Sequence, residues 1–169
     1  ILRRFPHARG MSHSTLALPA PDRGWILYSG GSESARGEDL RALAGKRSDL
    51  LVGIPAACVS TFVVDLPPVE ADLHESMIRA QVDKRGLSPK GGALVDVERI
   101  AGGERGDTFA VRVVRELPSE CLLTTAAGYQ LSASLRVSGG AKPAATVWRE
   151  QGRLVLGVAI RSTVVHVQV

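Results

Sequence analysis

The chain has 169 residues, of which 44% are hydrophobic and 22% are charged, which fits one domain of a soluble globular protein. Aromatic residues make up only 4% of the chain, so the core must be built mainly from aliphatic side chains, many of which favour strands. The net charge of +4 comes from scattered Lys and Arg residues and indicates no particular partner, and no window holds the ~20 consecutive apolar residues that a direct membrane span needs.

The N-terminal segment differs in composition from the rest of the chain. Residues 1–22 are rich in Pro, Ser and Arg and have no sustained periodicity, which predicts a largely disordered leader. Residues 1–10 contain no apolar run that fits a signal peptide, and they are either native or precede a natural start at Met11. We therefore expect an α/β core over residues 23–138 and a C-terminal unit over residues 144–169.

The first part of this core predicts short elements. Residues 25–28 form an apolar run between turn residues, which indicates a strand, and residues 30–37 are predicted to be a loop. Residues 38–45 have apolar side chains at helical spacing and predict a short helix that stops at Gly45.

Residues 50–86 predict a strand–strand–helix unit. Apolar runs place strands at residues 50–54 and 59–64, with a break at Pro55 between them. Residues 69–85 have a helical period, with Pro68 expected in the first turn and Gly86 just past the end. The predicted apolar stripe, which should cover the sheet, consists of Val69, Leu73, Met77, Ile78, Ala80 and Val82.

The following segment predicts a hairpin, a helix and a strand. Residues 93–100 and 108–114 alternate or run apolar on either side of a glycine-rich turn, as in an antiparallel hairpin. Residues 118–128 predict a second main helix between Pro118 and Gly128, and residues 129–137 predict a strand.

Residues 144–169 predict a β-meander with strands at residues 145–148, 154–160 and 163–169. A meander of ~25 residues is too small to hold a core alone. It must therefore extend the main sheet, pack on it, or pair with another chain.

Motifs for cofactors are weak in this sequence. The pairs Gly30-Gly31, Gly102-Gly103 and Gly139-Gly140 lack the residues that complete a phosphate loop, so we interpret all three as turns. The four histidines show no metal-ligand spacing, and His74 is expected on the surface of its helix. Cys58 and Cys121, the only cysteines, are flanked by apolar residues and are expected to be buried thiols in a reducing compartment. We expect no cofactor.

Two further residue sets leave alternatives open. Asp65, Asp96 and Glu98 are associated with strands and are candidates for a two-metal nuclease site, although solvated edge positions explain them better. The second set is the candidate interaction surface, in which Arg side chains and one Trp form a basic stripe with a stacking face for a protein or, less favoured, a nucleic acid. Its members are Trp148, Arg149, Arg153 and Arg161.

The order of apolar strands, prolines and helices along the chain resembles that of a known family. It runs through Ile54-Pro55, a strand ending at Pro67, a helix from Val69, the strand of residues 109–115 and the AAGY of residues 126–129. This order resembles the cytoplasmic actin-like proteins of bacterial envelope machines, such as the type IV pilus assembly protein PilM and the cytoplasmic part of the type II secretion protein GspL. Residues 147–156 resemble the strand–turn–strand that opens the second half of those proteins.

The resemblance implies a fold and a role. The fold is a ribonuclease-H-like, three-layer α/β sandwich with a mixed central sheet, two main helices and the C-terminal meander. The role is that of a non-catalytic cytoplasmic scaffold at the inner-membrane platform of a pilus or secretion system, held at the membrane through a partner. Its partners would be platform proteins, or a second copy bound through an edge strand.

The sequence departs from the pattern of this family at the ATP site, which argues against ATP binding. ATP-binding members carry a D-x-G turn after the first strand, and residues 25–30 contain none. No catalytic residue is therefore transferred. A divergent metal-dependent nuclease and a nucleic-acid-binding module of the same fold remain the alternatives.

Overall fold

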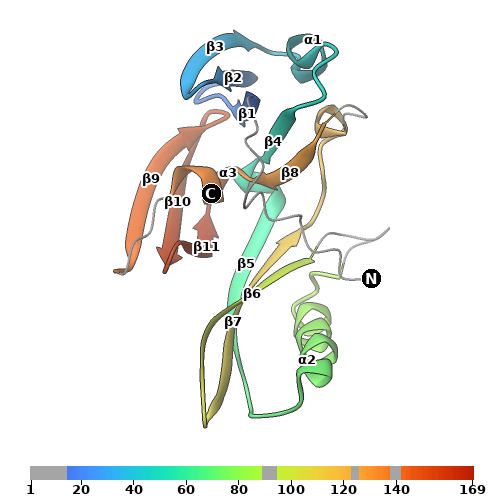
Figure 1. Cartoon of the computed structure of the whole chain (residues 1–169), viewed down its shortest axis with the longest axis vertical. Helices are drawn as coiled ribbons and strands as arrows, with labels where there is room; N and C mark the ends of the chain where they lie inside the picture. Colours follow the sequence, from blue (N-terminus) through green and yellow to red (C-terminus); the bar gives the residue numbers. More distant parts are fainter. Residues whose placement is uncertain (1–14, 89–94, 123–125, 138–141) are drawn as a thin grey trace.

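The structure is a computed structural model that describes residues 15–88, 95–122, 126–137 and 142–169. Within these ranges the strands form three separate sheets (Figure 1). Expectations for residues 1–14, 89–94, 123–125 and 138–141 lie outside the described residues, including the turn predicted at Gly139-Gly140.

The first sheet is mixed and has the strand order β3-β2-β1-β4-β8. Strands β1, β2 and β3 form its antiparallel half, β4 pairs in parallel with β1, and β8 pairs in parallel with β4. Helix α1 (Leu40–Ala44) is capped by the carboxylate of Asp39 and packs beside this sheet. It agrees with the helix predicted for residues 38–45. The strands are β1 (Thr15–Pro19), β2 (Trp25–Ser29), β3 (Ser32–Gly37), β4 (Leu50–Ile54) and β8 (Gly128–Leu131).

Strand β1 corrects the predicted leader of residues 1–22. Residues 15–19 lie between β2 and β4, and Ala17 is fully buried. The run Thr-Leu-Ala-Leu-Pro is too short to show a period, and its burial comes from neighbours that are distant in sequence. The predicted loop of residues 30–37 is also wrong, because β3 is a polar edge strand whose exposed side chains give no apolar signal.

The second sheet is antiparallel, with the order β5-β7-β6. Strands β6 (Val95–Gly103) and β7 (Gly106–Val114) form the predicted hairpin, and β5 (Val59–Leu66) pairs with β7. The residues 50–86 therefore do not form one local unit. A short 3-10 helix, η1 (Ala56–Cys58), carries the chain from β4 in the first sheet to β5 in the second.

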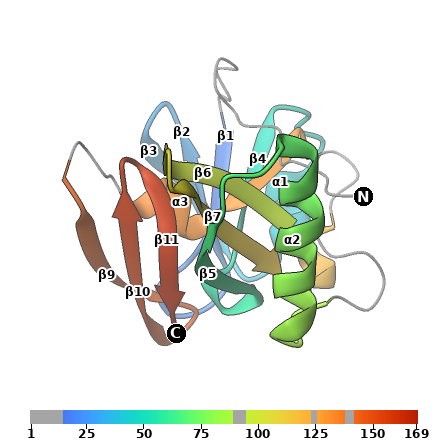
Figure 2. The same ribbon diagram turned by 90° about the horizontal axis from the view of Figure 1, so that it is seen from below.

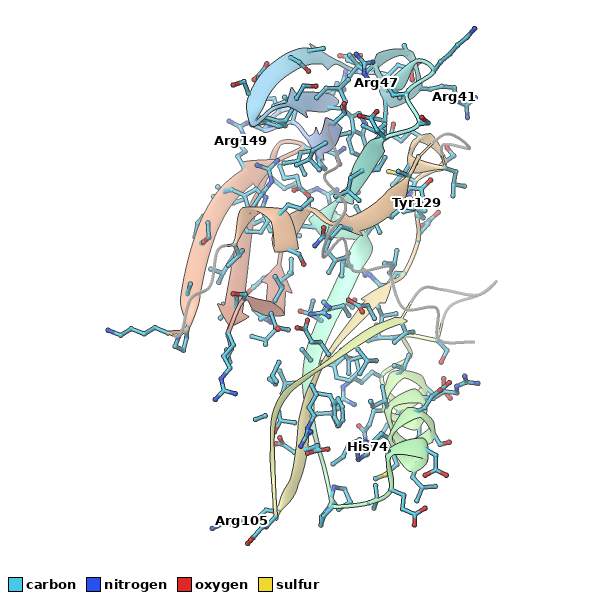
Figure 3. The ribbon with its side chains drawn as sticks, in the orientation of Figure 1. Arg41, Arg47, His74, Arg105, Tyr129 and Arg149 are labelled. Atoms are coloured by element: carbon cyan, nitrogen blue, oxygen red, sulfur yellow. The ribbon has the colours of Figure 1, made fainter. Side chains whose placement is uncertain are left out.

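Helix α2 (Ala71–Lys84) covers one face of this second sheet through part of the predicted stripe, namely Met77, Ile78 and Val82. Ile78 and Val82 are buried, whereas Leu73 is 49% exposed. His74 is not a surface residue: its side chain is 14% exposed and its ring packs edge-on against Phe109 at 5.0 Å (Figure 3). Apolar residues at three- and four-residue steps define two overlapping stripes, and the sheet selects the one that contains Ile78.

The third sheet is the predicted meander, in the order β11-β10-β9. It consists of β9 (Ala144–Glu150), β10 (Arg153–Ile160) and β11 (Thr163–Gln168). Of the three expected arrangements the structure shows packing, because the buried face of the meander contacts Ala56 and helix α3 (Ser132–Arg136), and β11 lies against β5 and β7 (Figure 2).

Two predicted elements between the second and third sheets are wrong. Where residues 118–128 predicted a main helix, the described part contains one 3-10 turn, η2 (Ser119–Cys121), which inserts Cys121 into the core. Where residues 129–137 predicted a strand, β8 ends at Leu131 and α3 follows. The α/β class is confirmed. Among the described residues α2 is the longest helix, and none is long and apolar enough to cross a membrane.

The contact between β1 and β4 provides a stability test. A Cβ atom at Gly53 would lie 2.6 Å from Leu18 Cδ2 and 3.2 Å from the Ala17 carbonyl oxygen. We predict that Gly53→Ala lowers the free energy of unfolding by about 1–3 kcal/mol, the usual cost of overpacking. Urea unfolding measures this change. Gly103→Ala, where a Cβ meets nothing within 4 Å, is the control, and equal stabilities of the two variants would contradict the β1–β4 pairing.

Candidate interaction site

Two of the three candidate metal-binding carboxylates face an arginine. Arg112, on β7, is buried and lies directly across from Asp96 on β6. Its Nε donates to Asp96 Oδ2 at 2.8 Å, and its Nη2 lies 3.1 Å from Glu98 Oε2. The guanidinium therefore occupies the position between the carboxylates that a cation would need. Its Nη1 also donates to the Val164 carbonyl at 3.3 Å, which ties the second sheet to β11.

The third carboxylate is elsewhere. Asp65 is exposed on β5, on the opposite side of β7 from β6, and accepts a hydrogen bond from Thr108 Oγ1 at 2.6 Å. The structure thus brings Asp96 and Glu98 together and leaves Asp65 apart. No group of three or more potential metal ligands gathers within the ranges that the structure describes.

Trp148 does not provide the exposed stacking face that was expected. Its indole packs in the meander core against Gly157, where a Cβ would lie 2.8 Å from Trp148 Cζ3, and its Nε1 donates to Glu150 Oε2 at 3.1 Å. The reason is strand parity, because Trp148 lies across from Val155, which is buried. An aromatic at an inward position gives the same sequence pattern as one at an outward position.

The three arginines of the candidate surface are exposed but do not form one stripe. Arg149 Nη2 lies 3.3 Å from Asp22 Oδ1 at the end of β9 (Figure 3). Arg161 Nη1 reaches the Ile100 carbonyl at 3.4 Å, and Arg153 lines a groove beside β11. The structure therefore directs the three side chains to three different neighbours.

We define the outer meander face by Val147, Arg149, Leu154 and Leu156. Its aliphatic side chains form an apolar patch. The register pairs Leu154 with Arg149 and Leu156 with Val147, so these side chains share one side of the sheet. Val147 is 64% exposed and Leu154 is 71% exposed. Large aliphatic side chains this exposed on a regular sheet are typical of a surface that another protein covers.

The turns of two hairpins meet at one end of the molecule. The β1–β2 turn contains Asp22-Arg23-Gly24, so a D-x-G sequence does follow the first strand once β1 is recognised. The expectation that such a turn is lacking depended on taking residues 25–28 as the first strand, and it is wrong on that point. The backbone amides of Gln151 and Gly152 donate to the carbonyls of Ala20 and Pro21, each at 2.8 Å. An anion between the turns would have to displace these two hydrogen bonds.

Glu150, which the sequence analysis did not single out, is a buried acceptor beside these turns. It is 3% exposed and accepts hydrogen bonds from the Ala56 amide at 2.6 Å and from Ser132 Oγ at 2.8 Å. Arg136 Nε lies 3.6 Å from Glu150 Oε2, and Arg136 Nη2 donates to the Pro19 carbonyl at 2.7 Å. The carboxylate thus links β9 to η1 and α3. The sequence did contain a signal for this burial, because Glu150 lies two residues after Trp148 and both side chains therefore point to the inward side of β9.

The two thiols are free and differ in burial. Desolvation in the core, with a smaller effect of the neighbouring Glu120, raises the pKa of Cys121 to about 12. Desolvation also raises the pKa of Cys58, which is only half-buried. Both groups are therefore protonated and unsuited to nucleophilic chemistry near neutral pH.

Comparisons with known proteins show a likeness in fold. No family model and no curated protein matches the chain. Among solved structures, the fold is similar to the cytoplasmic domain of EpsL, an inner-membrane component of the type II secretion system of Vibrio cholerae. The TM-score is 0.55 and the sequence identity is 14%, and the match covers 90% of this chain and 70% of that one. The likeness shows a shared fold and supports the GspL side of the resemblance.

The environment of Glu150 predicts a large effect of its removal. Glu150→Ala leaves the Ala56 amide, Ser132 Oγ and Trp148 Nε1 without their acceptor and Arg136 without its carboxylate, so we expect a loss of about 3–5 kcal/mol in the free energy of unfolding. Urea unfolding followed by tryptophan fluorescence measures it. Arg149→Ala, which breaks only an exposed pair, should change stability by less than about 1 kcal/mol. If the two variants were equally stable, Glu150 would not hold the structural role described.

The burial of Cys121 predicts slow alkylation. With a pKa of about 12, its thiolate fraction at pH 8.5 is low, and we expect reaction with iodoacetamide about a hundredfold or more slower than for an exposed thiol. Because the unfolded thiol ionises near its ordinary pKa, the contribution of this group to stability falls as the pH rises from about 8.5 towards 12. Mass spectrometry of timed reactions follows each cysteine, and equal rates in native protein and in urea would contradict the burial.

Proposed function

We propose that this protein is a non-catalytic scaffold in the inner-membrane platform of a type II secretion system or of the related type IV pilus machinery, acting on the cytoplasmic side. The observation that carries the proposal is the shared fold with the cytoplasmic domain of EpsL over 90% of the chain. The candidate carboxylates support it indirectly, because they hold the guanidinium of Arg112. Membrane attachment would occur through a partner.

The outer meander face is the proposed contact with a platform protein. Val147 and Leu154 together present an apolar centre, and Arg149 lies at its edge. An apolar centre with a polar rim is the usual organisation of a protein–protein interface. The free edge of β9 runs along the same face and would allow a second copy to add by strand pairing, the alternative partner.

Co-purification from the native host tests this proposal. The wild-type chain should recover a cytoplasmic or inner-membrane component of a secretion or pilus platform. Val147→Glu should reduce that recovery about tenfold, because a charge is placed in the centre of the apolar contact. Leu73→Glu is the control, since Leu73 is an exposed aliphatic residue on α2, at 49% against 64% for Val147. Circular dichroism establishes that both variants are folded.

The proposal fails if folded wild-type protein recovers no platform component. It also fails in its choice of surface if Val147→Glu and Leu73→Glu reduce recovery equally. Light scattering of the purified chain distinguishes the remaining outcome, in which Val147→Glu dissociates a dimer and the outer meander face joins two copies.

A further inference from the structure

Two outer strands converge on a groove that shares Leu154 with the outer meander face but not Val147. Strand β5 is the outer strand of the second sheet and β11 is the outer strand of the third. The two strands lie side by side, and the Val167 amide on β11 donates to Thr61 Oγ1 on β5 at 2.8 Å (Figure 2). Beyond this contact a groove of about 660 Å³ opens, lined by the first residues of β5 and the last residues of β11.

The lining of this groove combines aliphatic side chains with hydroxyl and amide groups and with two cations. Val59, Leu154 and Val167 supply aliphatic walls, and Arg115 and Arg153 reach it from different elements. Arg115 Nη2 donates to the Ala57 carbonyl at 2.9 Å, which fixes its guanidinium beside the groove. No Asp or Glu side chain is among the lining residues, and neither arginine has an Asp or Glu ion-pair partner in the part of the chain that the structure describes.

Two other grooves among the described residues have a different charge pattern. The groove between α2 and β6 contains Arg99 already paired with Asp107 at 2.6 Å, beside Glu75. A depression on the outer side of α2 is lined by Asp72, Glu75 and Asp83, with Arg79 bound to Glu75. The groove beside β5 and β11 therefore differs from both, because its arginines have no Asp or Glu side chain beside them.

We propose that this groove binds an extended acidic–apolar segment of a partner protein. The backbone of the segment would pair with the free edge of β5 or β11, as edge strands do in strand-addition complexes. Its aliphatic side chains would lie against Val59 and Val167, and its carboxylates would meet Arg115 and Arg153. The inference deepens the proposed function by naming the chemistry of a partner segment, and it rests on that function only for the partner's origin.

A peptide titration tests the groove. The probe is a fluorescein-labelled hexapeptide of alternating Val and Glu, and its counterpart has Lys in place of Glu. We expect the acidic peptide to raise fluorescence anisotropy saturably and the Lys peptide to bind at least about tenfold more weakly. The double variant Arg115→Glu with Arg153→Glu should weaken acidic-peptide binding about tenfold or more, whereas Arg41→Glu, an exposed reversal on α1 (Figure 3), should leave it unchanged.

Hydrogen exchange locates the bound peptide. Strand addition should slow exchange of the backbone amides of Ser60 or Thr61 in β5, or of Val169 after β11, when the peptide is present, and leave those of α1 unchanged.

Three results would overturn the proposal: no saturable binding, equal binding of the two peptides, or equal loss in the double variant and in Arg41→Glu. Tighter binding of a single-stranded oligonucleotide than of the acidic peptide would also overturn it, in favour of nucleic acid. None of these results bears on the Val147→Glu test, so the groove and the platform role fail separately.

Discussion

The carboxylate of Glu150 accepts hydrogen bonds from η1, α3 and its own strand, and the rest of the structure depends on this convergence. A buried carboxylate is costly unless its oxygens are satisfied, so the segments that supply the donors are held in one arrangement. The backbone bonds from Gln151 and Gly152 to the β1–β2 turn secure the same junction from the other side. Together they join the meander to the first sheet, while Arg112 joins β11 to the second.

Local patterns in the sequence predicted the elements whose stability is local. The β6–β7 hairpin, α1 and the three meander strands have turn residues and apolar runs that are visible in a short window. Strand β1 was missed because its burial comes from β2 and β4, and β3 because a polar edge strand has no apolar side. The strands before and after Pro55 were expected in one unit, since no local signal shows that η1 redirects the chain to another sheet.

The candidate site was predictable only in part, for the same reason. Residue type identified Asp96 and Glu98 as carboxylates on a strand, but only the register shows that they face Arg112. Trp148 and Arg149 were grouped by their closeness in sequence, and strand parity places them on opposite sides of β9. The groove between β5 and β11 joins residues more than a hundred positions apart, so it exists only in the folded chain.

The central claim is that the meander and the first sheet form one cooperative unit through Glu150. Native-state hydrogen exchange of the Val155 amide in the meander and the Val52 amide in β4 tests it most directly, because both side chains are buried in their sheets. The account predicts that both amides exchange with the same free energy of opening, equal to that of global unfolding. A meander that opens several kcal/mol more easily than β4 would contradict it.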